Sequence, residues 1–145
     1  MTKPELGVNV RETSTVTQAD GDVTELSSLC TGCLRESRSG LLLTYTDQTE
    51  GGKVFNRVRI SGDRVSVERT GAVSLSLTLE SGRTEQTVYR VPPFAFDMTV
   101  TTESVTVTRK PNGGLCIKLV FGTVLGGAPQ ATELVIEATP RRDAP

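Results

Sequence analysis

The sequence predicts an all-β protein with a single antiparallel meander β-barrel of about 8–10 strands. Apolar and polar residues alternate with a period of two along most of the chain, and helical periodicity is almost missing. Turn-forming residues separate the alternating runs at short intervals. Strands of this kind, each with one apolar face, close as a barrel or pack as a sandwich. The uniformly short connections favour a closed meander.

The alternating runs define the expected strands in chain order. The apolar positions are Leu6, Val8 and Val10; Val54, Val58 and Ile60; Val65 and Val67; Val73, Leu75, Leu77 and Leu79; Phe94, Phe96, Met98 and Val100; Val105 and Val107; Leu115, Ile117, Leu119 and Phe121; and Leu134, Ile136 and Ala138. Polar residues between them are expected to face water. Two more strands are expected at 23–34 and 41–46, on either side of a turn from Arg35 to Gly40. Ser61-Gly62-Asp63, Ser81-Gly82-Arg83 and Pro111-Asn112-Gly113-Gly114 are typical hairpin turns.

Length and composition indicate one soluble domain. The chain has 145 residues, which predicts a single barrel domain over 1–139 followed by a C-terminal tail at 140–145. The first ten residues do not resemble a signal peptide, and no run is apolar enough for a transmembrane helix. Three cysteines are too few for a disulfide scaffold. We therefore expect a reducing, cytoplasmic setting.

The absence of histidine restricts the chemistry that this chain can perform. It excludes Ser-His-Asp and Cys-His pairs and all His-ligated metal centres within the chain. The formal net charge of -1, from 16 basic and 17 acidic side chains, argues against a general attraction to nucleic acid or membranes. No catalytic residue, metal ligand or cofactor is assigned, and a non-enzymatic role is favoured over an enzymatic one.

Short motifs between Gly62 and Ile136 resemble the YwiB-like family. They are Gly62-Asp63-Arg64-Val65, Arg69-Thr70-Gly71-Ala72-Val73, Leu79-Glu80-Ser81-Gly82, Tyr89 followed by Pro92, Thr102 after an alternating strand, and Gly113-Gly114-Leu115. The resemblance covers about half of the chain, and it rests on the ordered series rather than on one specific motif. It implies a bacterial domain of unknown function with a calycin or lipocalin-like β-barrel. Pro92-Pro93-Phe94 replaces the Pro-Tyr-Gly usual in that family.

The Cys30-Thr31-Gly32-Cys33 segment is compatible with a redox pair or half of a zinc site. It lies inside an expected strand, however, where residues three apart point to opposite faces. Three extended residues span roughly 10 Å, whereas a disulfide requires Cα atoms within about 7 Å. A bulge at Gly32 would shorten the gap. The simpler interpretation is that both cysteines are structural.

Four residues are candidates for a ligand site. In a barrel of this class, an inward arginine and tyrosine can hold a carboxylate, and Tyr45, Arg69, Tyr89 and Arg90 are the candidates here. Tyr45 continues the face of Leu41 and Leu43. The competing interpretation is a barrel filled by its own aliphatic side chains.

We therefore expect non-enzymatic binding of a small molecule or a protein partner. The alternatives are an enzyme that uses carboxylate, tyrosine or thiol chemistry, and a weak nucleic-acid-binding barrel. Positive charge is concentrated over two neighbouring strands, and Phe55 shares a face with two of the basic residues, which are Lys53, Arg57, Arg59, Arg64 and Arg69. Positive charge beside an exposed aromatic ring is typical of a nucleic-acid surface, but a solvated sheet face explains it more simply. An edge strand left by incomplete closure would favour a homo-oligomer.

Overall fold

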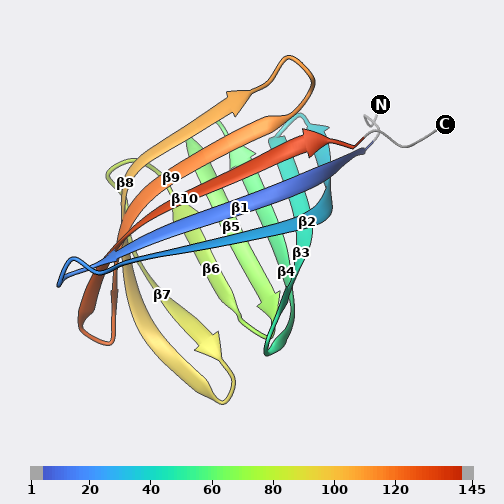
Figure 1. Ribbon diagram of the computed structural model, residues 1–145. Helices are drawn as coiled ribbons and strands as arrows, with labels where there is room; N and C mark the ends of the chain where they lie inside the picture. Colours follow the sequence, from blue (N-terminus) through green and yellow to red (C-terminus); the bar gives the residue numbers. More distant parts are fainter. Residues whose placement is uncertain (1–4, 142–145) are drawn as a thin grey trace.

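The computed structural model describes residues 5–141, in which ten strands and no helix are found (Figure 1). The strands are β1 (Leu6–Gln18), β2 (Val23–Ser37), β3 (Gly40–Thr49), β4 (Gly52–Ser61), β5 (Arg64–Gly71), β6 (Leu75–Leu79), β7 (Thr84–Val91), β8 (Phe94–Arg109), β9 (Leu115–Leu125) and β10 (Ala128–Pro140). They form one antiparallel sheet in the order β6-β5-β4-β3-β2-β1-β10-β9-β8-β7. The sheet curls into a nearly closed barrel, which confirms the predicted fold class.

Pairing of β1 with β10 joins the two halves of the meander. The register runs from Val8↔Pro140 to Gln18↔Gln130, so the start of the first strand lies beside the end of the last one. Pro140 is therefore part of β10, and the Arg141 N–H donates to the Gly7 carbonyl. Residues 142–145 of the expected tail lie outside the described residues.

Alternation places the aliphatic side chains inside the barrel. The buried apolar core includes Val8, Val10, Leu34, Leu43, Val58, Val65, Leu79, Leu115, Ile117, Leu119 and Ile136. Full burial of one such side chain contributes about 1.5–3 kcal/mol. The inward faces expected for β1, β4, β5, β9 and β10 are confirmed, and the exceptions lie in other strands. Val73 precedes β6, and Phe94 and Phe96 are exposed although they continue the face of Met98 and Val100.

Strands β2 and β3 separate along part of their length, as Figure 1 shows. Their ladder extends from Ser37↔Gly40 only to Gly32↔Tyr45. Residues 23–31 of β2 consequently pair with β1 alone, and their other backbone edge is open. Leu26 and Leu29 on this segment are 66% and 70% exposed.

The structure gives no helix within residues 5–141 that is long and apolar enough to cross a membrane.

Candidate ligand site at the barrel seam

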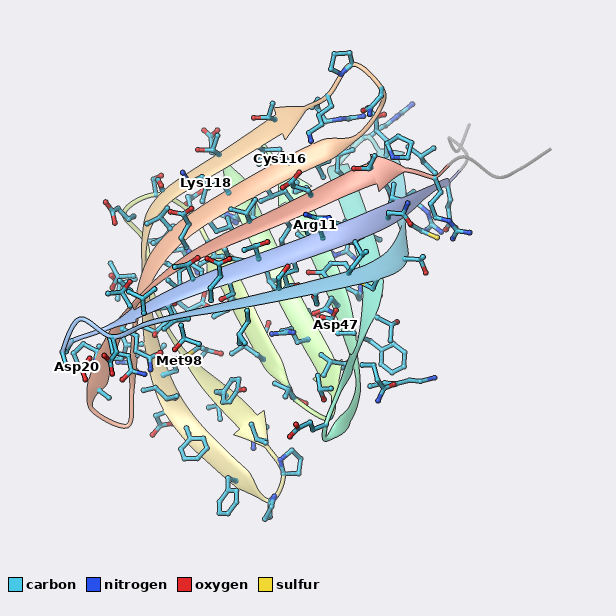
Figure 2. The ribbon with its side chains drawn as sticks, in the orientation of Figure 1. Arg11, Asp20, Asp47, Met98, Cys116 and Lys118 are labelled. Atoms are coloured by element: carbon cyan, nitrogen blue, oxygen red, sulfur yellow. The ribbon has the colours of Figure 1, made fainter. Side chains whose placement is uncertain are left out.

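The strand registers bring a row of polar residues together inside the barrel. Tyr45 pairs with Asn56 across β3 and β4, and Asn56 pairs with Arg69 across β4 and β5. Asp47 lies two residues beyond Tyr45 on the same face of β3, and Figure 2 shows it close to β2. Because side chains on one face of neighbouring strands are in contact, these four residues form one cluster.

Arg69 is held in place by two polar partners. Its Nε donates to Oδ1 of Asn56 at 2.9 Å, and its Nη2 lies 3.4 Å from Oδ2 of Asp47. Asn56 also donates to the same Asp47 oxygen at 3.0 Å. Asp47 and Asn56 are 8% and 2% exposed, whereas the Arg69 side chain retains 29% exposure. The guanidinium group therefore connects a buried network to solvent.

Tyr45 is a hydrogen-bond donor in this cluster and not a source of phenolate. Its hydroxyl donates to Oε2 of Glu12 at 2.6 Å. Burial raises the pKa of Tyr45 well above its usual value, and the Glu12 carboxylate raises it further. The tyrosine keeps its proton at physiological pH, so its environment does not favour the phenolate that tyrosine-based catalysis would need.

The two cysteines of the Cys-x-x-Cys segment point to opposite sides of the sheet. Cys30 faces Asp47, with Sγ 3.6 Å from Oδ1, whereas Cys33 lines a groove on the outer surface. Both are free thiols. Burial and the Asp47 carboxylate raise the pKa of Cys30 to about 12, which disfavours the reactive thiolate. No group of three or more metal-ligating side chains occurs in residues 5–141.

The barrel is least regular where β6 meets β7, the two ends of the sheet. One isolated bridge joins them, with the N–H groups of Ser74 and Arg90 each donating to the other's carbonyl at 2.9 Å. At the opposite end, two hydrogen bonds attach the turn between β6 and β7 to Thr102 of β8. The Gly82 N–H donates to the Thr102 carbonyl, and the Thr102 N–H donates to the Arg83 carbonyl. We call the region between these two attachments the seam.

Side chains replace backbone pairing in the middle of the seam. The Thr87 hydroxyl donates to the Ser76 carbonyl at 2.9 Å, and the Thr78 N–H donates to Oε1 of Glu85 at 3.2 Å. These two backbone groups of the β6 edge therefore have side-chain partners in place of a ladder with β7.

A recess of about 330 Å³ lies at the seam. Its lining combines residues from the outer face of the sheet with residues from the inner face: Glu68, Arg69, Thr70, Ser74, Leu75, Ser76, Thr87, Val88 and Arg90. Because both faces contribute, the recess leads from the surface toward the polar cluster. Its volume is at the lower end of the range of small-molecule sites, about 300–1,000 Å³.

The structure brings together some of the four candidate residues. Arg69 and Arg90 line the same recess from opposite sides of the seam, and Tyr45 belongs to the cluster behind it, separated from Arg69 by Asn56. Tyr89 is half-buried on β7 and does not line the recess. The Arg90 side chain is exposed and has no hydrogen bond or ion pair within the described residues. Asp47 and Glu12 accept the bonds from Arg69 and Tyr45 that a carboxylate ligand was expected to receive.

Sequence reasoning missed Glu12, Asp47 and Asn56. A signal was present, because each polar residue occupies an inward position on an otherwise apolar alternating run. Asn56 interrupts the face of Val54, Val58 and Ile60, and Asp47 continues the face of Leu43 and Tyr45. A polar residue at such a position is buried and needs a partner.

The fold and the seam together define an all-β antiparallel barrel with a small polar recess. The chain belongs to the DUF1934 family, a domain of unknown function, which matches residues 8–130. The structure is similar to the ywiB protein from Bacillus subtilis, with a TM-score of 0.86 and 19% sequence identity over 97% of this chain and 96% of that chain. At this identity the similarity establishes the fold alone. No curated protein matches the sequence.

Proposed function

We propose that this protein is a non-enzymatic binding barrel whose seam recess takes a small organic anion, such as a short-chain carboxylate. The observation that supports the proposal most directly is the convergence of Arg69 and Arg90 on one recess from strands on either side of the seam. The Arg90 guanidinium group has no counter-ion within the described residues, so it is available to an anion.

The other lining residues fit a small amphipathic anion. Leu75 and Val88 offer apolar contacts for a short aliphatic chain, and Ser74 and Thr70 supply hydroxyl groups. Glu68 also lines the recess, and its carboxylate would repel a bound anion. Binding is therefore expected to be weak and sensitive to the charge at residue 68.

Isothermal titration calorimetry with sodium hexanoate tests the proposal, with hexanamide as the uncharged comparison. Hexanoate is expected to bind the wild-type protein more tightly than hexanamide does. Arg90→Gln should weaken hexanoate binding about tenfold or more, because it removes the unpaired cation, and Glu68→Gln should strengthen it. Arg38→Gln, in the exposed turn between β2 and β3, is the matched control and should leave binding unchanged.

The proposal is wrong if hexanamide binds as well as hexanoate, if Arg90→Gln has the same effect as Arg38→Gln, or if hexanoate does not bind at all. Glu68→Gln distinguishes a recess effect from a loss of folding, since it should increase affinity.

The open edge of β2 favours a second function, self-association. Edge strands are normally protected by lysine, proline or a bulge, and none of these occurs between Val23 and Thr31. A twofold antiparallel pairing centred at Ser27 would place Glu25, the segment's one charged residue, opposite Leu29 of the second copy. No like charges would then face each other.

Sedimentation velocity of the full chain tests this self-association. The wild-type protein is expected to form a dimer at micromolar concentration, and the double variant Leu26→Lys/Leu29→Lys is expected to be monomeric. Both side chains are mostly exposed, so the substitutions should change the free energy of unfolding by no more than about 0.5 kcal/mol. Val124→Lys, at an exposed position of β9, is the control. A monomeric wild type, or a double variant that still dimerises, would contradict the pairing.

A further inference from the structure

The outer face of β4 carries an exposed aromatic ring in a row of positive charges. The outward residues of the strand are Lys53, Phe55, Arg57 and Arg59, all exposed, and they alternate with buried residues. Residues on one face of a strand are about 6.6 Å apart along its axis. The row is therefore a short linear array that contains three cations and one aromatic ring.

A groove of about 460 Å³ runs beside this row over β2, β3 and β4. Its outward lining includes Thr31, Cys33, Thr44, Thr46, Phe55 and Arg57. The Phe55 side chain is 52% exposed, which is unusual for a large aromatic residue. The threonine hydroxyl groups beside it can donate hydrogen bonds or accept them.

None of the three cations in this array forms an ion pair within residues 5–141. Glu68 is the cross-strand partner of Arg57, yet the two side chains form no ion pair. Across the part of the chain that the structure describes, neither Arg57 nor Arg59 forms an ion pair. Nearby Arg35 differs, because it pairs with Glu5. A local positive surface therefore exists on a chain whose formal net charge is -1.

We propose that this face binds single-stranded nucleic acid. One base would stack on the Phe55 ring, and nearby phosphates would pair with Lys53 on one side of the ring and with Arg57 and Arg59 on the other. Single strands expose the faces of their bases, so they can use an aromatic platform, whereas the bases of a duplex are already stacked. The net charge of the whole chain limits long-range attraction, and it does not cancel contacts made at a local groove.

The number of cations predicts how binding depends on salt. Lys53, Arg57 and Arg59 would contact about three phosphates, so log Kobs is expected to fall with log [salt] with a slope of about -2. The affinity should be weak and should vary little with base sequence, because stacking on an aromatic ring and pairing with phosphates discriminate little between bases.

Fluorescence anisotropy with a labelled oligo(dT) strand and the full-length protein tests the proposal. Phe55→Ala is expected to weaken binding about fivefold to a hundredfold, because it removes a stacking platform. Arg57→Gln/Arg59→Gln should weaken binding and make the salt slope shallower by about 1.4. Phe94→Ala and Arg38→Gln are matched controls at exposed positions outside the groove and should have no effect.

A competitor distinguishes nucleic acid from an acidic protein segment. Poly-glutamate of equal charge should compete poorly, because it cannot stack on Phe55. The proposal is overturned if oligo(dT) does not bind in 50 mM salt, if Phe55→Ala binds as tightly as Phe94→Ala, or if poly-glutamate competes equally well. Far-UV circular dichroism of each variant checks that a lost signal does not reflect unfolding.

Discussion

Replacement of Asp47 by alanine is expected to lower the free energy of unfolding by about 2–3 kcal/mol. Asp47 lies in the barrel interior, where it accepts a hydrogen bond from Asn56 and pairs with Arg69. Without it, the Arg69 cation would remain partly buried with no counter-ion. Solvent reaches part of the Arg69 side chain, so the effect should be smaller than the roughly 3–5 kcal/mol of a fully buried pair.

Urea denaturation measures this effect, and the chain provides a matched comparison. Glu80→Ala removes a carboxylate that pairs with Arg64 at 3.4 Å on the surface, and it should cost less than about 1 kcal/mol. The double variant Asp47→Ala/Arg69→Leu should recover part of the lost stability, because the uncompensated charge is gone. If Asp47→Ala is no more destabilising than Glu80→Ala, the cluster does not stabilise the barrel.

The strand pattern was predictable from the sequence because burial alone determines it. In β4, alternation placed Val54, Val58 and Ile60 inside and Phe55 and Arg57 outside, and the structure confirms all five. The expected ends were less accurate. The strand expected at 41–46 extends through Gly40–Thr49, because its polar end still pairs with β4 although it contributes little to the apolar core.

The polar cluster required information that a single strand does not contain. Asn56 meets Tyr45 and Arg69 because the registers of three strands align, and register depends on turn geometry and on the packing of all faces. The seam is more difficult still to predict. Pairing of Ser74 with Arg90 depends on how far the whole sheet curls, which is an outcome of ten strands together.

Gly32 has a structural role, but not the bulge that the sequence suggested. A bulge at this glycine would have brought Cys30 and Cys33 closer together. The register of β1 with β2 instead passes through Gly32 without a shift, and the cysteines stay on opposite faces. The glycine is needed for a different reason. A Cβ atom here would collide with the Thr44 carbonyl oxygen and would lie 2.9 Å from Cβ of Tyr45.

Gly32→Ala is therefore expected to destabilise the protein by about 2–3 kcal/mol, at the upper end of typical overpacking effects. The colliding atom belongs to the backbone of β3, so a side-chain rotation cannot relieve the contact. The ladder between β2 and β3 ends at the Gly32↔Tyr45 pair, and we expect the strands to separate further from that point. Tyr45 would then move away from Glu12 and weaken their 2.6 Å hydrogen bond.

Gly7→Ala is the control for the glycine substitution itself. Gly7 lies in β1, opposite Cys33, and a Cβ atom there would have no neighbour within 4 Å. Because alanine has less backbone freedom to lose than glycine, this variant should be neutral or about 0.5–1 kcal/mol more stable. A loss of stability in Gly32→Ala but not in Gly7→Ala, measured by urea denaturation, would show that close approach of β3 to β2 explains the glycine. Equal stability of the two variants would mean that the strands can move apart without cost, and the barrel wall beside the polar cluster would then be adaptable rather than fixed.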